Sequence, residues 1–301
     1  MPTDADFSVA FHIGAHKTAT SHLQRSLEHS SDALADVGVR YYGPKHFRLP
    51  GRTIPALFGK KPPAKENLRK RTPREQVDRM RKGGHRLVLS EENFIGVLNT
   101  PRRRMVERRY PHAAQRISDL AESMDVGGFD ILLGVRQSTS FLNSAYCQML
   151  MGGKVTPVDD FKRLNPLSGV DWQALVAELR QATGVKRLLV WQYEDYGMVF
   201  DQISAGLVGH DHAELVQPHR KRIHVSLSGQ AVSKLQDLAG TGHQQIEQSA
   251  ADLSRQHPVS EAFPPFDCFS EDTHRAAAET YASQIDAIGA MDGVTLLRPR
   301  A

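Results

Sequence analysis

Short apolar segments alternate with amphipathic segments along the whole chain, and this alternation limits the folds open to it. Four segments have the length and apolar content of buried strands: 7–13, 86–89, 131–135 and 187–191. Segments with helical periodicity lie between and after them: 18–27, 113–124, 139–151, 172–182, 226–238 and 272–288. Strands separated by helices pair in parallel and need helices on both faces. The sequence therefore predicts an α/β fold with a central parallel sheet flanked by helices.

The chain has 301 residues, and we expect a single domain across residues 1–301. A basic, Pro-rich excursion at about residues 43–85 interrupts the alternation and is either a mobile lid or a disordered insertion. Between residues 60 and 109, 16 Lys/Arg residues face 6 Asp/Glu, a local charge of +10. This block either attracts an acidic partner or forms a solvated surface. A nucleic-acid partner is not expected, because no recognised binding motif accompanies the charge.

Several classes of protein are excluded by composition. Two cysteines, Cys147 and Cys268, are too few for a disulfide scaffold and suit a reducing compartment. No apolar run approaches the ~18–20 residues that span a bilayer, so we expect no membrane span and a cytoplasmic location. The 14 histidines form no H-E-x-x-H motif and no Cys/His cluster, so we expect no metal. We interpret His210-Asp211-His212 as a polar loop.

Small and hydroxyl-bearing residues follow the first predicted strand, in the run Gly14-Ala15-His16-Lys17-Thr18-Ala19-Thr20-Ser21. The backbone N–H groups of Lys17 to Ser21 are expected to open a helix without intrahelical partners, at the positive end of its dipole. This arrangement suits a phosphate, and Lys17 adds a full charge. The structural alternative is an ordinary helix start capped by Thr18. The Walker spacing G-x-x-x-x-G-K-[ST] is absent, which disfavours a nucleoside-triphosphate kinase.

Polar residues also follow the second and third predicted strands, and ligands of parallel sheets bind beyond the carboxyl ends of strands. Arg136 ends the third strand, and Ser140 and Ser144 share one face of the helix behind it. A guanidinium at this place recognises phosphate bidentately. The second strand is followed by Glu91 and Glu92, either of which is a candidate general base. Because they alternate on an extended chain, only one should face a ligand, and we choose Glu92.

Four segments resemble the sulfotransferases that use 3′-phosphoadenosine-5′-phosphosulfate (PAPS). The run F-H-I-G-A-H-K-T-A-T-S-H-L-Q at 11–24 is similar to their 5′-phosphosulfate loop, with Ala19 where glycine is usual and Ser21 where threonine is usual. Arg136 and Ser144 match the spacing R-x-x-x-x-x-x-x-S of their 3′-phosphate site. Segment 90–93 resembles an S-x-E-N motif, and segment 220–228 resembles R-x-N-x-S-L-S with histidine in place of asparagine.

The resemblance implies transfer of a sulfuryl group from PAPS, without a metal ion, to a hydroxyl or amine. It implies a small-molecule, carbohydrate or lipid acceptor. Lys17 and Glu92 would be the catalytic residues. The residues expected to bind the donor are His16, Lys17, Thr18, Ala19, Thr20, Ser21, Arg136, Ser144, Arg220 and Arg222.

Two other functions stay open on the sequence. One is an atypical P-loop kinase acting on a small molecule, which would need magnesium. The other is a non-catalytic module that binds a nucleotide or polyanion, and Ala19 in place of glycine favours it because its methyl group adds bulk near the phosphate. If neither Glu91 nor Glu92 is the base, His16 and His224 are the next candidates.

Overall fold

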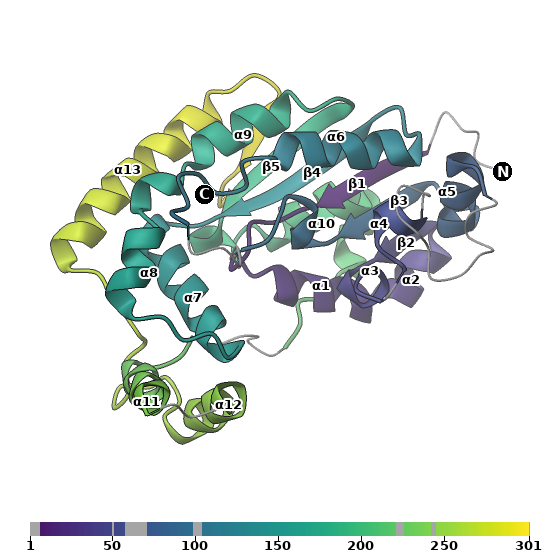
Figure 1. The fold of residues 1–301 in the computed structure, drawn as a ribbon. Coiled ribbons are helices and arrows are strands. Elements are labelled where there is room, and N and C mark those ends of the chain that lie inside the picture. The colour runs from purple at the N-terminus through teal and green to yellow at the C-terminus, as the bar shows by residue number, and fades with distance from the viewer. Residues whose placement is uncertain are drawn as a thin grey trace.

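The computed structural model describes residues 7–49, 51–57, 71–98, 104–220, 226–241 and 245–300. Its centre is a six-stranded sheet in the order β2-β3-β1-β4-β5-β6, and every strand pair is parallel (Figure 1). The strands are β1 (Ser8–His12), β2 (Val39–Tyr42), β3 (Arg86–Ser90), β4 (Phe129–Val135), β5 (Val185–Gln192) and β6 (Val294–Leu297). The predicted α/β class with a central parallel sheet is therefore confirmed.

The strand order contains one switch of direction, beside β1. After β1 the chain turns to β2 and β3 on one side, and it then crosses to β4 and continues to β5 and β6 on the other. The loops that leave β1 and β4 therefore diverge beyond the carboxyl ends of these two neighbours, and we call this region the crevice. This is the place where open parallel sheets bind their ligands.

Thirteen α-helices surround the sheet in the described ranges. They are α1 (Thr20–His29), α2 (Ser31–Asp36), α3 (Pro44–Phe47), α4 (Ile54–Leu57), α5 (Pro73–Arg81), α6 (Ala113–Met124), α7 (Ser138–Met151), α8 (Val158–Leu164), α9 (Trp172–Arg180), α10 (Phe200–Val208), α11 (Gly229–Gly240), α12 (Ile246–Gln256) and α13 (Glu271–Gly289). In this part of the chain no helix has the length and apolar content needed to cross a membrane.

The two faces of the sheet bury separate apolar clusters. Phe11, Leu89 and Ile131 belong to the larger cluster, to which α5, α6, α7, α9 and α13 contribute. Ala10 and Leu132 belong to the smaller one, with side chains of α1, α2 and α10. Both clusters follow from the near-continuous apolar strands, because alternate side chains of a strand point to opposite faces.

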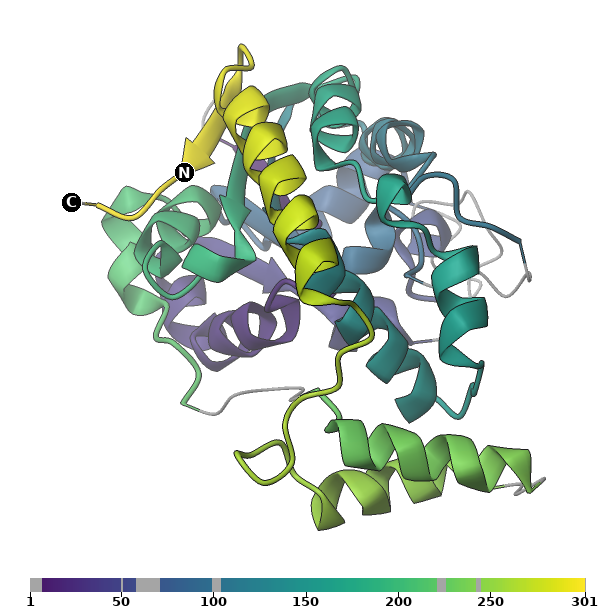
Figure 2. The same cartoon turned by 90° about the vertical axis from the view of Figure 1, so that its left-hand side faces the viewer.

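Helix α7 is buried almost all round, and its buried residues include the polar Thr139, Asn143 and Ser144. Helices α11 and α12 form a hairpin that packs beside α7 and lies apart from the sheet (Figures 1 and 2). Ser228 ties the base of this hairpin, because its hydroxyl caps α11 at the Ala231 N–H (3.3 Å) and donates to the His257 carbonyl (2.7 Å).

The boundaries correct several expectations. Strands β2 and β6 have four residues each and are absent from the prediction, since so short a segment carries little periodicity. The expected helix at 226–238 begins at Gly229, and Ser228 is its N-cap. Of the expected excursion at 43–85, the described part contains α3, α4 and α5, and α5 packs on β2 and β3; the part at 58–70, with much of the basic block, lies outside the described residues.

A buried ion cluster lies near the amino ends of the strands, opposite the crevice. Asp130 accepts two hydrogen bonds from Arg187, at 3.0 and 2.6 Å, and one from Arg86 at 3.1 Å. The side chains of Arg86 and Asp130 are 9% and 8% exposed. The Arg86 guanidinium also donates to the Gly206 carbonyl at 2.7 Å, which ties β3 to α10. The cluster therefore joins three strands and a helix.

We expect Asp130→Ala to lower the free energy of unfolding by about 3–5 kcal/mol, because it leaves the buried Arg86 charge unpaired. Urea unfolding followed by circular dichroism measures this. Asp160→Ala is the control, since it removes an exposed ion pair with Arg163 and should cost less than about 1 kcal/mol. Equal losses in the two variants would contradict the role of the cluster.

Candidate active site

The loop after β1 lies in the crevice between β1 and β4 and is bonded to both sides of it. The Ala15 N–H donates to the Gly134 carbonyl at 3.1 Å, which extends the pairing of β1 and β4 into the loop. Arg136, just after β4, donates from Nη1 to the Lys17 carbonyl at 2.9 Å. The loop and the end of β4 are therefore held as one unit.

Two residues of this loop have an unusual backbone conformation. Lys17 and Ala19 have φ angles of 66° and 63°, in the left-handed region. Left-handed backbone is costly for a residue with a Cβ, so glycine would adopt the conformation of position 19 at a lower cost than Ala19 does. No described residue accepts a hydrogen bond from the backbone N–H groups of residues 17–21. The loop therefore presents donors without partners, as an anion site requires.

The helix begins later than the sequence predicts. It starts at Thr20 with Ala19 as N-cap, so residues 17–19 belong to the loop and not to the helix. The alternative of a Thr18 cap is wrong, because the Thr18 hydroxyl donates backward to the Ala15 carbonyl at 2.6 Å. The change has a physical reason: the left-handed conformations of Lys17 and Ala19 cannot continue a helical turn.

Two glycines permit the close packing of the loop. A Cβ on Gly14, where φ is 21°, would lie 2.7 Å from Thr20 Cγ2 and 3.0 Å from His12 Nε2. A Cβ on Gly134 would lie 2.9 Å from Thr18 Oγ1. Burial lowers the pKa of His12 to about 4, so this ring is neutral beneath the loop. The groups packed against Gly14 and Gly134 are therefore neutral: His12, Thr18 and Thr20.

The Arg136 guanidinium is held from three directions. Its Nε donates to Ser140 Oγ at 2.8 Å, and its Cζ lies 4.1 Å from the centroid of the Tyr193 ring. Glu194, the next residue of η5 (Tyr193–Asp195), accepts the Gln137 N–H at 3.1 Å. Burial lowers the pKa of Arg136, and Tyr193 and Glu194 oppose that shift. The Arg136 guanidinium is therefore a cation held in a fixed position at the end of β4, the strand next to β1.

The pKa of Lys17 is affected by both of the other charged groups of the site, Arg136 and Glu92. Burial is the largest cause that lowers its pKa, and the nearby Arg136 lowers it further. Glu92 acts in the opposite direction and raises it. The structure therefore brings Lys17, Arg136 and Glu92 into one electrostatic environment, although they are distant in sequence.

Arg48 bridges the two candidate carboxylates. It donates to Glu91 through Nε at 2.9 Å and Nη2 at 2.8 Å, and to Glu92 Oε1 through Nη2 at 2.7 Å. Gln24 donates to the other oxygen of Glu92 at 3.0 Å. Burial raises the pKa of Glu92, but Arg48 and Gln24 outweigh it and the pKa is lowered. Glu92 is therefore an ionised carboxylate with each oxygen oriented.

Glu91 has a different role from Glu92. Its side chain is 5% exposed, and its Oε1 accepts from the backbone and side-chain nitrogens of Asn93 at 3.2 and 2.8 Å. It therefore caps the short helix η3 (Glu92–Phe94) in addition to binding Arg48. With these bonds Glu91 acts as an anchor for the segment that carries Glu92.

The bonding of His16 assigns its tautomer. The Tyr110 hydroxyl accepts the His16 backbone N–H at 3.2 Å and bonds the ring Nδ1 at 2.9 Å. We assign the hydroxyl hydrogen to Nδ1, which leaves the proton of the neutral ring on Nε2. Burial lowers the pKa of His16, while Glu92 and a hydrogen bond with the Asn93 side chain raise it. In this arrangement the neutral His16 ring carries its proton on Nε2, and its role as a reserve base stays a prediction.

The remaining predicted residues are placed as follows. Ser144 lies in α7, two turns after Arg136, and is 8% exposed. Arg220 is exposed and is preceded by His219, whose N–H donates to Ser26 Oγ in α1 at 3.0 Å. Arg222 and His224 lie outside the described residues. Beyond them, Ser226 donates to Cys147 Sγ in α7 at 3.2 Å.

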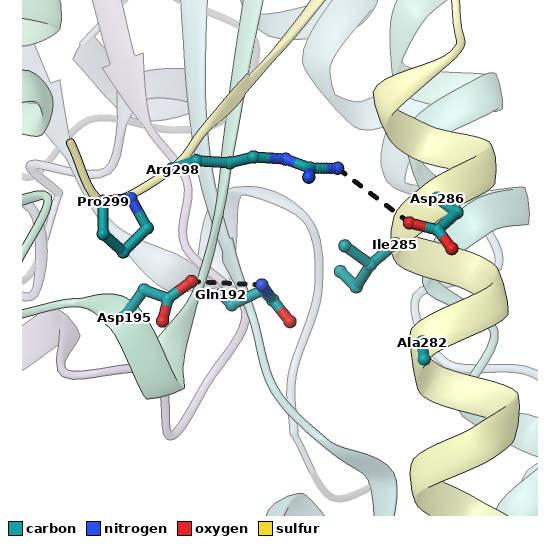
Figure 3. Close-up of a pocket in the computed structure, with 7 residues that line it drawn as sticks. All are labelled: Gln192, Asp195, Ala282, Ile285, Asp286, Arg298 and Pro299. Carbon is teal, nitrogen blue, oxygen red and sulfur yellow. Dashed lines mark hydrogen bonds and ion pairs between the residues drawn. The ribbon is translucent and has the colours of Figure 1, made fainter. Parts of the chain in front are cut away.

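A shallow hollow of about 430 Å³ lies at the carboxyl end of β5, beside α13 (Figure 3). Gln192, at the end of the strand, donates to Asp195 at 3.1 Å. Arg298 points across the hollow toward Asp286 at 3.9 Å (Figure 3). The hollow is one strand beyond Arg136 and contains none of the predicted site residues. Among the described residues no group of three or more His, Cys, Asp or Glu side chains forms a candidate metal site.

Several residues of the site are absent from the sequence-based prediction. Arg48, Gln24, Tyr110 and Tyr193 contact predicted site residues. Arg48 is half exposed and lies in the Pro-rich excursion, where no local pattern indicates a contact with Glu91 or Glu92. Gln24 is one helical turn beyond Thr20 on α1, so helical spacing was the one signal that pointed to it.

No model of a known protein family matches the chain, and no curated protein matches it. Among solved structures, it is similar to the crystal structure of a sulfotransferase from Alicyclobacillus acidocaldarius. The match covers 84% of this chain and 97% of that one, with 16% sequence identity and a TM-score of 0.41. At these values the likeness does not establish a family.

We expect Arg48→Met to lower the free energy of unfolding by about 1–3 kcal/mol at pH 7, because two carboxylates lose a shared donor. The lowered pKa of Glu92 means that its stabilisation is present above the unfolded pKa of about 4.3 and is lost as the pH falls through the folded value. The difference between wild type and variant should therefore shrink below about pH 4.

Urea unfolding at pH 7 and pH 3.5 measures this difference. Lys45→Met is the control, because its ion pair with Glu28 is exposed and should contribute less than about 1 kcal/mol. A loss in Arg48→Met that stays the same at both pH values would show that the guanidinium acts through packing alone.

Proposed function

We propose that this protein is a sulfotransferase that moves the sulfuryl group of PAPS to a hydroxyl or amine acceptor, without a metal ion. The observation that carries the proposal is the convergence of three groups on one crevice. These are a loop of unpartnered N–H donors with Lys17, the Arg136 guanidinium bonded to that loop, and the ionised Glu92 carboxylate. Two anion-binding groups and one carboxylate match a doubly phosphorylated donor and an acceptor that must lose a proton.

PAPS, the sulfuryl donor, matches the hydrogen-bond donors of the crevice. The N–H groups of residues 17–21 would hold the 5′-phosphosulfate, with hydroxyls from Thr18, Thr20 and Ser21 nearby. Arg136 and Ser144 would hold the 3′-phosphate. When bound, PAPS supplies a sulfuryl group on a phosphate leaving group, so the protein needs to supply no covalent catalysis.

Lys17 is the group suited to the leaving oxygen. It lies in the loop that would hold the 5′-phosphate, and its cation would balance charge that grows on the bridging oxygen. Arg136 lowers the pKa of Lys17 and Glu92 raises it, so bound anions would add to the effect of Glu92 and favour the charged ammonium.

Glu92 is the group suited to the acceptor. Its pKa is lowered, so the carboxylate is ionised and able to take a proton at neutral pH. Arg48 and Gln24 occupy one lone pair on each oxygen, and a carboxylate oxygen accepts more than one hydrogen bond. Either oxygen therefore keeps capacity for an acceptor O–H or N–H. The acceptor class stays as predicted: a small molecule, carbohydrate or lipid.

We expect adenosine 3′,5′-bisphosphate to bind without metal and more tightly than ATP. Arg136→Ala should weaken the bisphosphate roughly tenfold more than it weakens 5′-AMP, because both ligands share the loss of the bond to the Lys17 carbonyl but only the bisphosphate loses a charged hydrogen bond worth ~1.5–3 kcal/mol. Isothermal titration calorimetry measures both affinities. Arg255→Ala, which removes an exposed cation of α12, is the control. A strict magnesium requirement, with ATP binding as tightly, would favour the kinase instead.

The base is tested by Glu92→Gln, which should reduce turnover by ~10²–10⁴-fold with little change in bisphosphate affinity. Label transfer from radioactive PAPS to a panel of hydroxyl and amine acceptors measures turnover. Glu91→Gln should reduce thermal stability more than Glu92→Gln, because Glu91 caps η3. Full turnover in Glu92→Gln would place the base elsewhere, and donor binding without labelling of any acceptor would favour a non-catalytic binding module.

A further inference from the structure

A chain of polar side chains connects α13 to the first turn of α7, outside the crevice. His274, in the first turn of α13, has Nε2 2.7 Å from Asp267 Oδ2 and Nδ1 2.7 Å from Thr139 Oγ1. Asp267 Oδ1 accepts from the Asn143 amide at 2.7 Å and from the Phe269 N–H at 3.0 Å. Figure 2 shows the start of α13 beside α7. The chain of bonds therefore ties two helices that are distant in sequence.

The directions of these bonds assign the protons. Gln137 Oε1 accepts the Ser140 N–H at 2.9 Å, so the atom is an oxygen. It lies 2.7 Å from Thr139 Oγ1, and two oxygens at this distance need a hydrogen between them, which the Thr139 hydroxyl supplies. Thr139 Oγ1 then accepts from His274 Nδ1. Since Asp267 accepts from Nε2, all bonds are satisfied together when His274 carries both protons.

The neutral ring breaks this order. If Nδ1 of His274 is unprotonated, the Thr139 hydroxyl must donate to it, and Thr139 Oγ1 and Gln137 Oε1 then face each other without a hydrogen. Gln137 is the N-cap of α7, and Ser140, which it caps, accepts the Arg136 Nε hydrogen at 2.8 Å. Four consecutive hydrogen bonds therefore connect His274 to Arg136, the proposed 3′-phosphate residue.

The charged surroundings of His274 act in both directions. Asp267 stabilises the imidazolium directly, and Glu271 and Asp272 lie on the same helical turn. The positive end of the α13 dipole and the adjacent Arg275 oppose it, although Arg275 is paired with Asp272 at 3.2 Å. From α8, Lys162 lies over the Phe269 ring at 5.5 Å, and that ring contacts His274. The ion pair with Asp267 is the direct contact among these.

We propose that His274 is a positioning residue that, as the imidazolium, fixes the first turn of α7 and with it Arg136. The affinity of the 3′-anion site then falls as His274 loses its proton. This inference rests on the proposed function for its effect on the ligand. It concerns a contact outside the crevice, and it needs neither the base nor the acceptor.

Asp267→Asn is a variant that the geometry singles out. The Oδ1 atom of the introduced asparagine accepts the same two hydrogen bonds from Asn143 and Phe269, and its NH₂ group replaces the oxygen that faces His274 Nε2. A neutral ring then accepts at Nε2 and donates from Nδ1 to Thr139, so every bond is satisfied without the extra proton. The variant should therefore hold α7 in place at high and low pH alike.

Calorimetric titration of adenosine 3′,5′-bisphosphate and 5′-AMP between about pH 5.5 and 8.5 tests the proposal. The ligand ionises in the same way with every variant, so its effect on affinity cancels when variants are compared at one pH. Relative to wild type, His274→Gln should weaken the bisphosphate about three- to tenfold at the acidic end and leave 5′-AMP within about twofold. The deficit should vanish at the alkaline end. Asp267→Asn should match wild type at the acidic end and bind more tightly than wild type at the alkaline end.

Arg275→Gln is the matched control, because it removes a neighbouring cation on the same turn without touching the bonded chain, and it should follow wild type. A deficit in His274→Gln that is equal at all pH values, or equal for both ligands, would overturn the proposal in favour of a merely structural role. So would an Asp267→Asn variant that loses affinity.

Imidazole ¹⁵N resonances of His274 in the free protein give a readout that needs no ligand. Both ring nitrogens should be protonated at about pH 6 in wild type, and only Nδ1 in Asp267→Asn. A neutral ring in wild type would overturn the assignment of protons. Wild type that binds no bisphosphate at any pH would refute the proposed function and the effect on affinity, while the resonances would still decide the protonation of the ring.

Discussion

The hydrogen bond from Arg136 to the Lys17 carbonyl is the contact on which the candidate site depends. It joins the ends of two neighbouring strands whose loops diverge, so it spans the crevice that the sheet topology opens. A carbonyl that accepts from a guanidinium cannot turn toward a bound anion, and the N–H groups of the loop are left to do so. The left-handed conformations at Lys17 and Ala19 maintain that orientation.

A second constraint is the sharing of Arg48 between two buried carboxylates. One carboxylate, Glu91, accepts four hydrogen bonds, and the other, Glu92, accepts one side-chain bond on each oxygen and keeps capacity for further donors. The bond from Asn93 to Glu91 extends the same network to η3. The bonds of Arg48 and Gln24 therefore orient Glu92 and tie α1 to the segment after β3.

The polar chain around His274 extends this principle to the outer layer. Arg136 is held by Ser140, Ser140 by the Gln137 cap, and the cap by Thr139 and α13. Such a chain is effective because α7 is buried almost all round, and a buried helix has few other ways to adjust its first turn. The long C-terminal helix thus contributes to the site without containing any of its predicted residues.

The sequence by itself determined the α/β class, four of the six strands, and the positions of Lys17, Glu92 and Arg136 after strand ends. These depend on local periodicity and on chain order, which a single sequence carries. Only the tertiary structure decided which groups meet them. Arg48 bonds Glu91 across 43 positions of the chain, Tyr110 bonds His16 across 94, and His274 bonds Thr139 across 135. Pairing at such distances depends on how the sheet is ordered and its helices pack, and no local pattern encodes either.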